Sequence, residues 1–230
     1  MKSDLKNIFI LIRPFQHVKN LLIFMPLLFV DRVNGIEAVS NGVMAFVAFS
    51  ISASALYILN DYKDMTEDRK HPLKKNRPLV SGSVAEDVAI FLIVIFLITG
   101  SCLMAATSLQ ALAFLVSYIT INIAYSLQLK HIVFLDVIIL AFGFVLRLFV
   151  GSSATAIPLP MWVILMMFFL GVFLALAKRR GDVLAFTDAD RNGGKVMDGY
   201  SLPLIDGAIM VMTLVVIIVS ILFINGVRPW

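Results

Sequence analysis

The sequence predicts an all-α membrane protein, a single bundle of about seven transmembrane helices. Its composition is one reason, because 60% of the residues are hydrophobic and only 15% are charged. A soluble domain is nearer half apolar and a quarter charged. The second reason is that the apolar residues gather in separate runs, most of them near the roughly 20 residues that a helix needs to cross a bilayer. The third is that the charged residues lie mainly between these runs.

The first apolar run follows a short N-terminal segment without a secretory signal, because no small-residue cleavage site ends a short apolar core. We therefore expect this run to stay in the mature protein as the first spanning helix. Residues 3–12 are expected to form a short helix at the membrane interface. The predicted spans are Phe15–Val30, Ala38–Asp61, Ala85–Ala106, Leu109–Leu127, Ile132–Val150, Met161–Ala177 and Leu202–Ile224.

The positive charges are distributed asymmetrically across this predicted bundle. Of the 19 Lys and Arg residues, only Arg32 and Arg228 fall on one side, and Arg147 lies within the fifth helix. The positive-inside rule then predicts an inner-membrane protein with its N-terminus and its two longer loops in the cytoplasm. Topology alone would explain Lys2 and Lys6, but it does not explain the carboxylates mixed with the other cations.

Four polar residues stand at helical spacing where the second apolar run ends. Asn60, Asp64 and Asp68 fall at i, i+4 and i+8 and share one helix face, which Asp61 flanks. Like charges stacked in this way repel each other unless a cation bridges them. Carboxylate oxygens suit Mg²⁺, whose shell is often completed by substrate phosphates. The segment therefore predicts a site for magnesium and a diphosphate at a membrane face.

Cations follow these carboxylates in the same connection, among them Lys74 and Arg77. Lys and Arg bind phosphate oxygens, so they suit the part of a diphosphate that a metal ion leaves uncovered. Pro72 and Pro78 are expected to end the helix and Gly82 to form a turn. The alternative is a solvated loop held by Asp–Lys pairs without any ligand.

A second polar segment closes the fourth run and opens the fifth. Lys130 and His131 are placed for a phosphate at the same face, and Tyr125 precedes them. Asp136 is ionisable within an apolar run, which makes it a functional candidate by default. Alternatively, Asp136 pairs with Lys130 or His131 only to orient the fifth helix. Arg147 lies close to the far side, where we expect it to snorkel or to pair.

The basic triplet Lys178, Arg179 and Arg180 is predicted to end the sixth helix. Three cations there suit the helix dipole and the topology alone. They would equally form a clamp for a phosphate, and both explanations stay open. The segment from Arg13 to Asn20 is a basic start to the first helix and by itself unspecific.

Other common chemistries lack their motifs in this chain. It has no Walker-type Gly-x-x-x-x-Gly-Lys, no Cys/His zinc set and no Gly-x-Ser-x-Gly elbow. We expect its partners to be the lipid bilayer and phosphorylated substrates, and no nucleic acid.

At these polar segments the chain resembles the UbiA superfamily of intramembrane transferases. The pattern Asn-Asp-x-x-Asp-x-x-x-Asp-Arg-x-His-Pro at residues 60–72 is similar to that superfamily's first aspartate-rich signature. Residues 13–20 and 74–82 fit the superfamily too, and the similarity extends to about Tyr200. Three further segments together resemble the branch that uses phosphoribosyl diphosphate and polyprenyl phosphate, namely residues 125–136, 143–147 and 178–180.

The resemblance implies a Mg²⁺-dependent transferase that moves a 5-phosphoribosyl group from phosphoribosyl diphosphate to a decaprenyl-type polyprenyl phosphate and releases diphosphate. It implies that Asp61, Asp64 and Asp68 are catalytic and, with Asn60, hold Mg²⁺. The isoprenoid tail would enter an apolar cavity between helices, and a homo-oligomer is left open. The expected substrate-binding residues are Lys19, Asn20, Asn60, Lys74, Arg77, Tyr125, Lys130, His131, Asp136, Lys178 and Arg179.

Two departures from the superfamily leave alternatives open. Residues 178–182 are mostly basic where aromatic prenyltransferases of the superfamily carry a second aspartate motif, which weakens the case for a prenyl-diphosphate donor. The chain also ends after the seventh predicted helix, so we expect it to lack the last two helices of a normally nine-helix fold. The alternatives are a UbiA-type prenyltransferase with an aromatic or glycerol-phosphate acceptor, and a non-catalytic truncated membrane partner.

Overall fold

The computed structural model describes residues 5–29, 35–69, 74–129, 132, 134–187 and 201–224. Within those ranges the chain folds into helices and their connections and contains no strand, as predicted. The chain forms two compact units, each considered by itself. Unit 1 comprises Met1–Leu127 and Arg147–Ile157, and unit 2 comprises Gln128–Leu146 and Pro158–Trp230. That the chain is a single domain stays a prediction.

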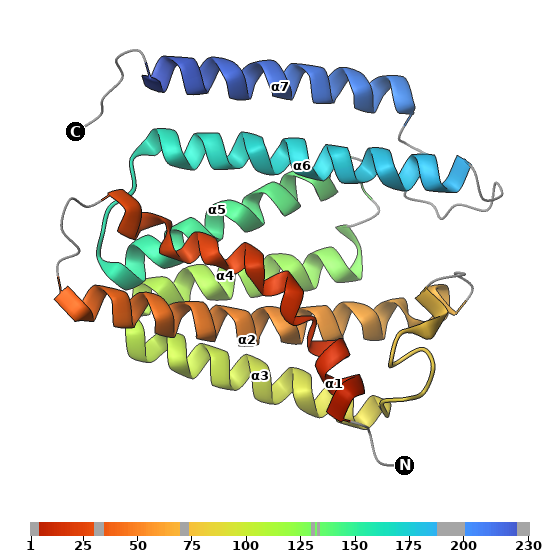
Figure 1. The fold of residues 1–230 in the computed structure, drawn as a ribbon. Helices are drawn as coiled ribbons and strands as arrows, with labels where there is room; N and C mark the ends of the chain where they lie inside the picture. Colours follow the sequence, from red (N-terminus) through yellow and green to blue (C-terminus); the bar gives the residue numbers. More distant parts are fainter. Residues whose placement is uncertain are drawn as a thin grey trace. The chain divides into compact units, whose positions relative to one another are not determined.

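Six helices in the described part of the chain are long and apolar enough to cross a membrane. A bent pair, α1 (Leu5–Ile12) and η1 (Pro14–Phe29), makes a seventh if it is counted as one span (Figure 1). This agrees with the predicted number. The six helices are α2 (Gly35–Asp68), α3 (Glu86–Thr107), α4 (Leu109–Leu127), α5 (Leu135–Thr155), α6 (Met161–Thr187) and α7 (Leu202–Ile224).

The bend between α1 and η1 lies at Arg13 and measures 43°. Pro14 follows, and a proline disfavours the α conformation in the residue before it. Arg13 is not in the α conformation and has a φ of 55°, in the left-handed region. The short helix predicted over residues 3–12 is therefore present as α1, and the next element is a 3₁₀-helix rather than the α-helix that was expected.

Two helices extend beyond their predicted spans. Helix α2 continues past Asp61 to Asp68, as the helical spacing of its polar residues predicted, and α6 continues past Ala177 to Thr187, beyond the predicted end of the sixth helix. An apolar run marks where the hydrocarbon ends, whereas Lys, Arg and Glu remain good helix formers beyond it. At 34 residues α2 is long, because about 1.5 Å per residue makes it roughly 51 Å, against a hydrocarbon core of about 30 Å. Its polar residues therefore sit on helix, not in a loop.

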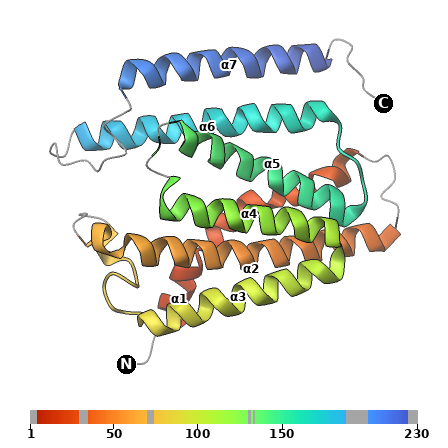
Figure 2. The same ribbon diagram turned by 180° about the vertical axis from the view of Figure 1, so that it is seen from behind.

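Unit 1 is built around α2, which packs against α1, η1, α3 and α4. Figures 1 and 2 show α2 and α3 running side by side. Ala48 and Ser52 of α2 are completely buried, and a Cβ added at Gly100 of α3 would lie 2.7 Å from the Ala48 carbonyl oxygen. Small residues permit this close approach of two backbones, as is common between membrane helices.

The connection from α2 to α3 is fixed by a small apolar cluster. Leu79 and Val84 are buried there against Ile58 and Met65 of α2, with neighbours from α1 and α3. Gly82 has a φ of 73° and forms the predicted turn. Because the loop is held on both sides of this turn, the residues just before it, including the short 3₁₀ element η2 (Lys74–Asn76), are held beside the last turns of α2.

Unit 2 contains the first part of α5 together with α6 and α7. Figures 1 and 2 show α6 and α7 side by side. Their shared core includes Val137 of α5, Leu176 of α6 and Ile205 of α7, all nearly inaccessible. A Cβ at Gly171 would lie 2.9 Å from the Ala141 Cα, so α5 and α6 also approach closely.

Replacing Gly151 of α5 with alanine should destabilise unit 1. The added Cβ would lie 2.8 Å from the Ile23 carbonyl carbon of η1, a backbone atom that a rotamer change cannot move. Overpacking of this kind costs about 1–3 kcal/mol, so the thermal unfolding midpoint in detergent should fall clearly. Gly207→Ala in α7 is the matched control, because nothing lies within 4 Å of its Cβ position. Equal midpoints for both variants would contradict the close approach.

Candidate functional site

Two carboxylates near the end of α2 are buried among arginines. Asp61 is 2% exposed and Asp68 is 3% exposed. The Oδ1 atom of Asp61 accepts hydrogen bonds from Arg13 Nη2 at 2.5 Å and from Arg77 Nη1 at 3.0 Å. These arginines come from different parts of the chain, one from the bend before η1 and one from the loop after η2. The carboxylate therefore joins three segments of unit 1.

Arg77 also bridges the two carboxylates. Its Nη1 atom donates to Asp68 Oδ2 at 2.5 Å as well as to Asp61, and Lys74 Nζ lies 3.9 Å from Asp68 Oδ1. Removing one partner from a buried ion pair leaves an uncompensated charge and is strongly destabilising. The arginines thus relieve the repulsion between carboxylates that share one end of a helix, and they place cations next to any anion that binds there.

Asn60 and Asp64 form the more accessible part of the same helix end. Asn60 Nδ2 donates to Asp64 Oδ2 at 3.0 Å, and Ser126 Oγ near the end of α4 donates to Asn60 Oδ1 at 3.4 Å. Both Asn60 and Asp64 are half-buried, unlike Asp61. The predicted cluster therefore lies together at the end of α2. Its two aspartates Asp61 and Asp68 are buried, whereas Asn60 and Asp64 are partly accessible.

These oxygen atoms fit Mg²⁺ by their chemistry. Among the described residues, no three His, Cys, Asp or Glu side chains are grouped so that they could hold a metal ion by themselves. Mg²⁺ is usually held by only one or two carboxylates, with waters and substrate phosphates completing its shell. An Asn–Asp pair beside buried carboxylates and arginines would suit such a shared site, and the assignment of residues 60, 61, 64 and 68 as metal ligands stays a prediction.

Arg13 is the residue that sequence reasoning undervalued, because the basic start of the first helix looked unspecific. The left-handed bend turns it back toward α2, where its guanidinium also lies 5.8 Å from the Tyr57 ring centroid. The Arg-Pro pair at residues 13–14 is the local signal for the bend. Nothing local to that pair indicates that Asp61 is the partner.

The remaining predicted site residues lie in several places. Lys74 is exposed on η2, Lys19 is exposed on η1, and Tyr125 is half-buried on α4. Asn20 lies in a separate buried cluster with Arg147, described below. Lys130 and His131 lie outside the described residues. The others, Asp136, Lys178 and Arg179, belong to unit 2.

The basic triplet in unit 2 lies within α6 and not at its end, which corrects the prediction. Arg179 Nε donates at 2.5 Å to Asp136, which is completely buried at the start of α5. Arg180 Nε donates at 2.6 Å to Asp206 of α7, in a largely exposed pair. Successive helical residues point in different directions, so these two arginines connect α6 to two neighbours. Lys178 is exposed.

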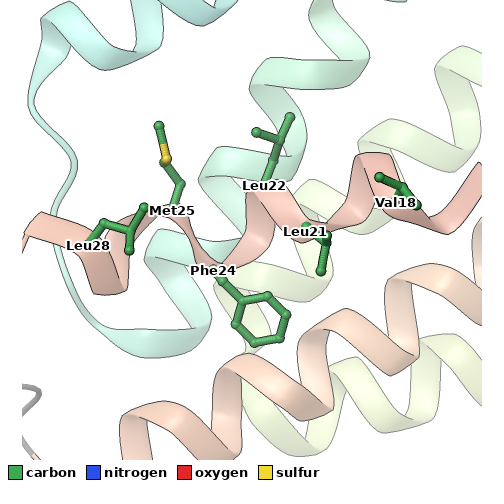
Figure 3. A pocket seen from close by; sticks show the side chains of 6 residues that line it. All are labelled: Val18, Leu21, Leu22, Phe24, Met25 and Leu28. Atoms are coloured by element: carbon green, nitrogen blue, oxygen red, sulfur yellow. The ribbon is translucent and has the colours of Figure 1, made fainter.

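An apolar groove lies along η1, with a volume of about 200 Å³. Figure 3 shows Phe24 directed toward α2 and Leu22 and Met25 directed away from it. Sites that enclose a drug-sized ligand measure roughly 300–1,000 Å³, so this groove is too small to enclose a polyprenyl chain. Its lining residues are Val18, Leu21, Leu22, Phe24, Met25 and Leu28.

Several known proteins are related to this chain in sequence. The chain is 33% identical over 189 residues to the decaprenyl-phosphate phosphoribosyltransferase of Mycobacterium tuberculosis strain H37Rv, which covers 80% of this chain and 62% of that protein. It is 34% identical over 191 residues to the protein of the same name from Mycolicibacterium smegmatis, covering 80% and 58%. The matched part is therefore less than two thirds of the length of these relatives.

The fold is similar to that of a solved UbiA homologue from Archaeoglobus fulgidus bound to DMAPP and Mg²⁺. The TM-score is 0.77 at 20% sequence identity, over 95% of this chain and 78% of that one. The sequence profile of the UbiA prenyltransferase family matches residues 23–230, which include the whole carboxylate end of α2. With that profile covering most of its length, and with the predicted helical membrane architecture present, this chain is a member of the UbiA prenyltransferase family.

Proposed function

We propose that this protein transfers a 5-phosphoribosyl group from phosphoribosyl diphosphate to a polyprenyl phosphate of decaprenyl type. The observation that carries the proposal is the site on α2, where Asp61 and Asp68 are interleaved with Arg13 and Arg77. Such a mixture of carboxylates and guanidinium groups suits a metal-bound diphosphate. The phosphoribosyl donor is favoured because relatives that are 33–34% identical carry that activity in their names.

The α2 carboxylates and Asn60 would bind the donor through Mg²⁺, which supplies charge neutralisation of the diphosphate leaving group. Asp64 is the most accessible carboxylate of the set and would bind first. Arg13 and Arg77 lie next to the same carboxylates, so they would bind phosphate oxygens of the diphosphate that Mg²⁺ leaves uncovered. Bidentate arginine contacts to phosphate are strong and directional.

In the proposed reaction, a phosphate oxygen of the acceptor attacks the anomeric carbon of the ribose. The bond from that carbon to the diphosphate oxygen breaks, and its electron pair leaves with the diphosphate. The acceptor phosphate is already ionised at neutral pH, so the step needs no strong general base. In-line displacement inverts the configuration at the anomeric carbon. The cations of the site would hold two anions together against their mutual repulsion.

We place this site on the cytoplasmic face of the cell (inner) membrane. Most Lys and Arg residues fall on the same side of the spans as α2's polar end in the predicted topology, and the positive-inside rule assigns that side to the cytoplasm. A water-soluble sugar diphosphate would reach the site from there. The isoprenoid tail of the acceptor would approach from the bilayer.

A second candidate is prenyl transfer from a prenyl diphosphate. The fold favours it, because solved UbiA homologues with TM-scores of 0.77 are bound to DMAPP or GPP and Mg²⁺. Both donors present a diphosphate to the same carboxylates, so the site geometry alone fits either.

One assay separates the candidates. Membranes that contain the 230-residue chain are incubated with Mg²⁺, polyprenyl phosphate and phosphoribosyl diphosphate labelled in the ribose. We expect the label to enter the lipid fraction and to stay in water when Mg²⁺ is chelated. Label that enters lipid only from a labelled prenyl diphosphate with an aromatic or glycerol-phosphate acceptor would overturn the proposal in favour of prenyl transfer. No transfer from either donor would indicate a non-catalytic membrane partner.

A further inference from the structure

Unit 1 contains a second polar cluster, buried within its spanning helices and separate from the carboxylates. Arg147 of α5 is 5% exposed, and its Nε atom donates to Asn20 Oδ1 of η1 at 2.8 Å. Its Nη2 atom donates to the Tyr118 hydroxyl of α4 at 3.1 Å. Asn20 in turn donates from Nδ2 to Ser50 Oγ of α2 at 2.9 Å. One guanidinium therefore connects, directly or through Asn20, four elements of the unit.

Aromatic rings help to stabilise this buried charge. The Arg147 Cζ atom lies 5.0 Å from the ring centroids of both Phe49 and Tyr118. Cation–π contacts of this kind contribute about 2 kcal/mol or more when they are desolvated. A charged residue deep in a membrane protein is costly and usually has a function. Of the two outcomes expected for Arg147, snorkelling or pairing, the structure shows pairing with Asn20 and Tyr118.

The element that Arg147 contacts is an unusually long 3₁₀-helix. η1 is a 3₁₀-helix of 16 residues, although such helices have poorer hydrogen-bond geometry and rarely exceed three or four residues. Its buried residues are Asn20, Ile23 and Pro26. Arg147 contacts the first of these, and Gly151 lies directly against the backbone of the second. Two residues one turn apart on α5, Arg147 and Gly151, thus contact two residues one turn apart on η1.

Arg147 is too far from the carboxylates to act on them directly. The Arg147 cluster reaches α2 at Ser50. Asp61 lies three turns further along the same helix, about 16 Å away by helical rise. The N-terminal part of η1 spans this separation. His17 is hydrogen-bonded at 2.9 Å to Ser54 of α2, and Arg13 at the bend contacts Asp61. The polar contacts between η1 and α2 therefore form a series from the Arg147 cluster to the carboxylate site.

We propose that Arg147 is a positioning residue that fixes η1 and thereby holds Arg13 against Asp61. With Arg147 in place, η1 is anchored in the middle of unit 1, and the bend delivers the Arg13 guanidinium to a defined place. Without it, Asn20 loses its charged partner, η1 is free to shift along α2, and the Arg13–Asp61 contact becomes looser.

The test measures the coupling between Arg13 and Asp61 with and without Arg147. Thermal unfolding midpoints in detergent are determined for Arg13→Gln, Asp61→Asn and the double variant, first in the wild type and then in Arg147→Gln. The non-additive part of the midpoint shifts reports the pair. We expect this part to fall by at least half in Arg147→Gln. An unchanged coupling, even with a lower overall midpoint, would show that Arg147 only stabilises the fold and would overturn the proposal.

Four further variants keep the test decisive. If Arg147→Gln does not fold, Tyr118→Phe and Asn20→Ala each remove one contact of Arg147, and the same reduction in coupling is expected from both. Arg147→Lys should restore the coupling only in part, because one ammonium cannot reproduce the planar fork that contacts Asn20 and Tyr118. Arg180→Gln is the matched control, because it removes an exposed ion pair in unit 2 and should leave the coupling unchanged.

A consequence for catalysis rests on the proposed function. If Arg13 binds the donor diphosphate, Arg147→Gln should raise the KM for phosphoribosyl diphosphate more than it lowers kcat. This readout fails if the chain transfers nothing, whereas the coupling measurement needs no activity. The two results therefore distinguish a wrong positioning role from a wrong function.

Discussion

Asp64→Asn should reduce transfer by roughly 10²–10³-fold, which is the usual effect of removing one group that stabilises charge in a transition state. The half-buried Asp64 accepts a hydrogen bond from Asn60 at 3.0 Å, and an amide oxygen at position 64 can accept the same bond. The folded protein should therefore keep nearly its normal unfolding midpoint. What it would lose is one negatively charged oxygen ligand for the Mg²⁺ that binds the diphosphate. Initial rates with labelled donor and thermal unfolding together measure both effects.

Two neighbours on the same helix serve as controls for this variant. Glu67→Gln removes the same charge from an exposed position and should change neither rate nor midpoint. Asp68→Asn should lower both, because Asp68 is 3% exposed and contacts Arg77 at 2.5 Å. If Asp64→Asn keeps full activity while Glu67→Gln does not, the metal-binding face of α2 has been assigned incorrectly.

Arg77→Gln should increase the stabilisation of the protein by Mg²⁺ alone and decrease its affinity for the donor. Arg77 bridges Asp61 at 3.0 Å and Asp68 at 2.5 Å, so its guanidinium occupies the space between two carboxylates that a divalent cation would also neutralise. Without it, the like charges on α2 repel each other, and the protein should unfold at a lower temperature. Added Mg²⁺ should then raise the unfolding midpoint more than it does in the wild type.

Donor binding should change in the other direction in the same variant. A phosphate contact is lost, and truncating a buried charge partner commonly costs about 2–5 kcal/mol, which corresponds to roughly 30-fold or more in affinity. We therefore expect the KM for phosphoribosyl diphosphate to rise by about 30-fold or more. Lys75→Gln, exposed on η2, is the charge-matched control. A midpoint in Arg77→Gln that responds to Mg²⁺ no more than the wild type would contradict this exchange of cations.

The spanning helices could be predicted because membranes impose a length on apolar runs, and that length is visible in the residues themselves. The shared face of Asn60, Asp64 and Asp68 was predictable for a similar reason, since helical spacing is local. The span that hydropathy alone predicts ends at Asp61, although the backbone remains helical to Asp68. A hydropathy profile does not distinguish polar helical turns outside the hydrocarbon from a loop.

Partners far apart in sequence were beyond local patterns. Arg13 and Asp61 are 48 positions apart, and Arg147 and Asn20 are 127 positions apart. Each pair depends on how η1 bends and packs, which no spacing rule specifies. The ion pairs of Arg179 and Arg180 were not predictable for a related reason. Adjacent cations suggest a common ligand, but on α6 their side chains diverge, and two of them contact carboxylates of different helices.

The bend at Arg13 places two unrelated demands on one residue. A left-handed backbone costs most residues about 1–2 kcal/mol, and glycine or asparagine would adopt it more readily. Neither carries the guanidinium that Asp61 contacts, whereas lysine keeps the charge but not the fork. Glycine or asparagine at position 13 would therefore suit the left-handed backbone but lose the ion pair with Asp61. Lysine would keep the charge but lose the geometry of the guanidinium contact. Arginine accepts the cost of the left-handed backbone and keeps the guanidinium contact with Asp61.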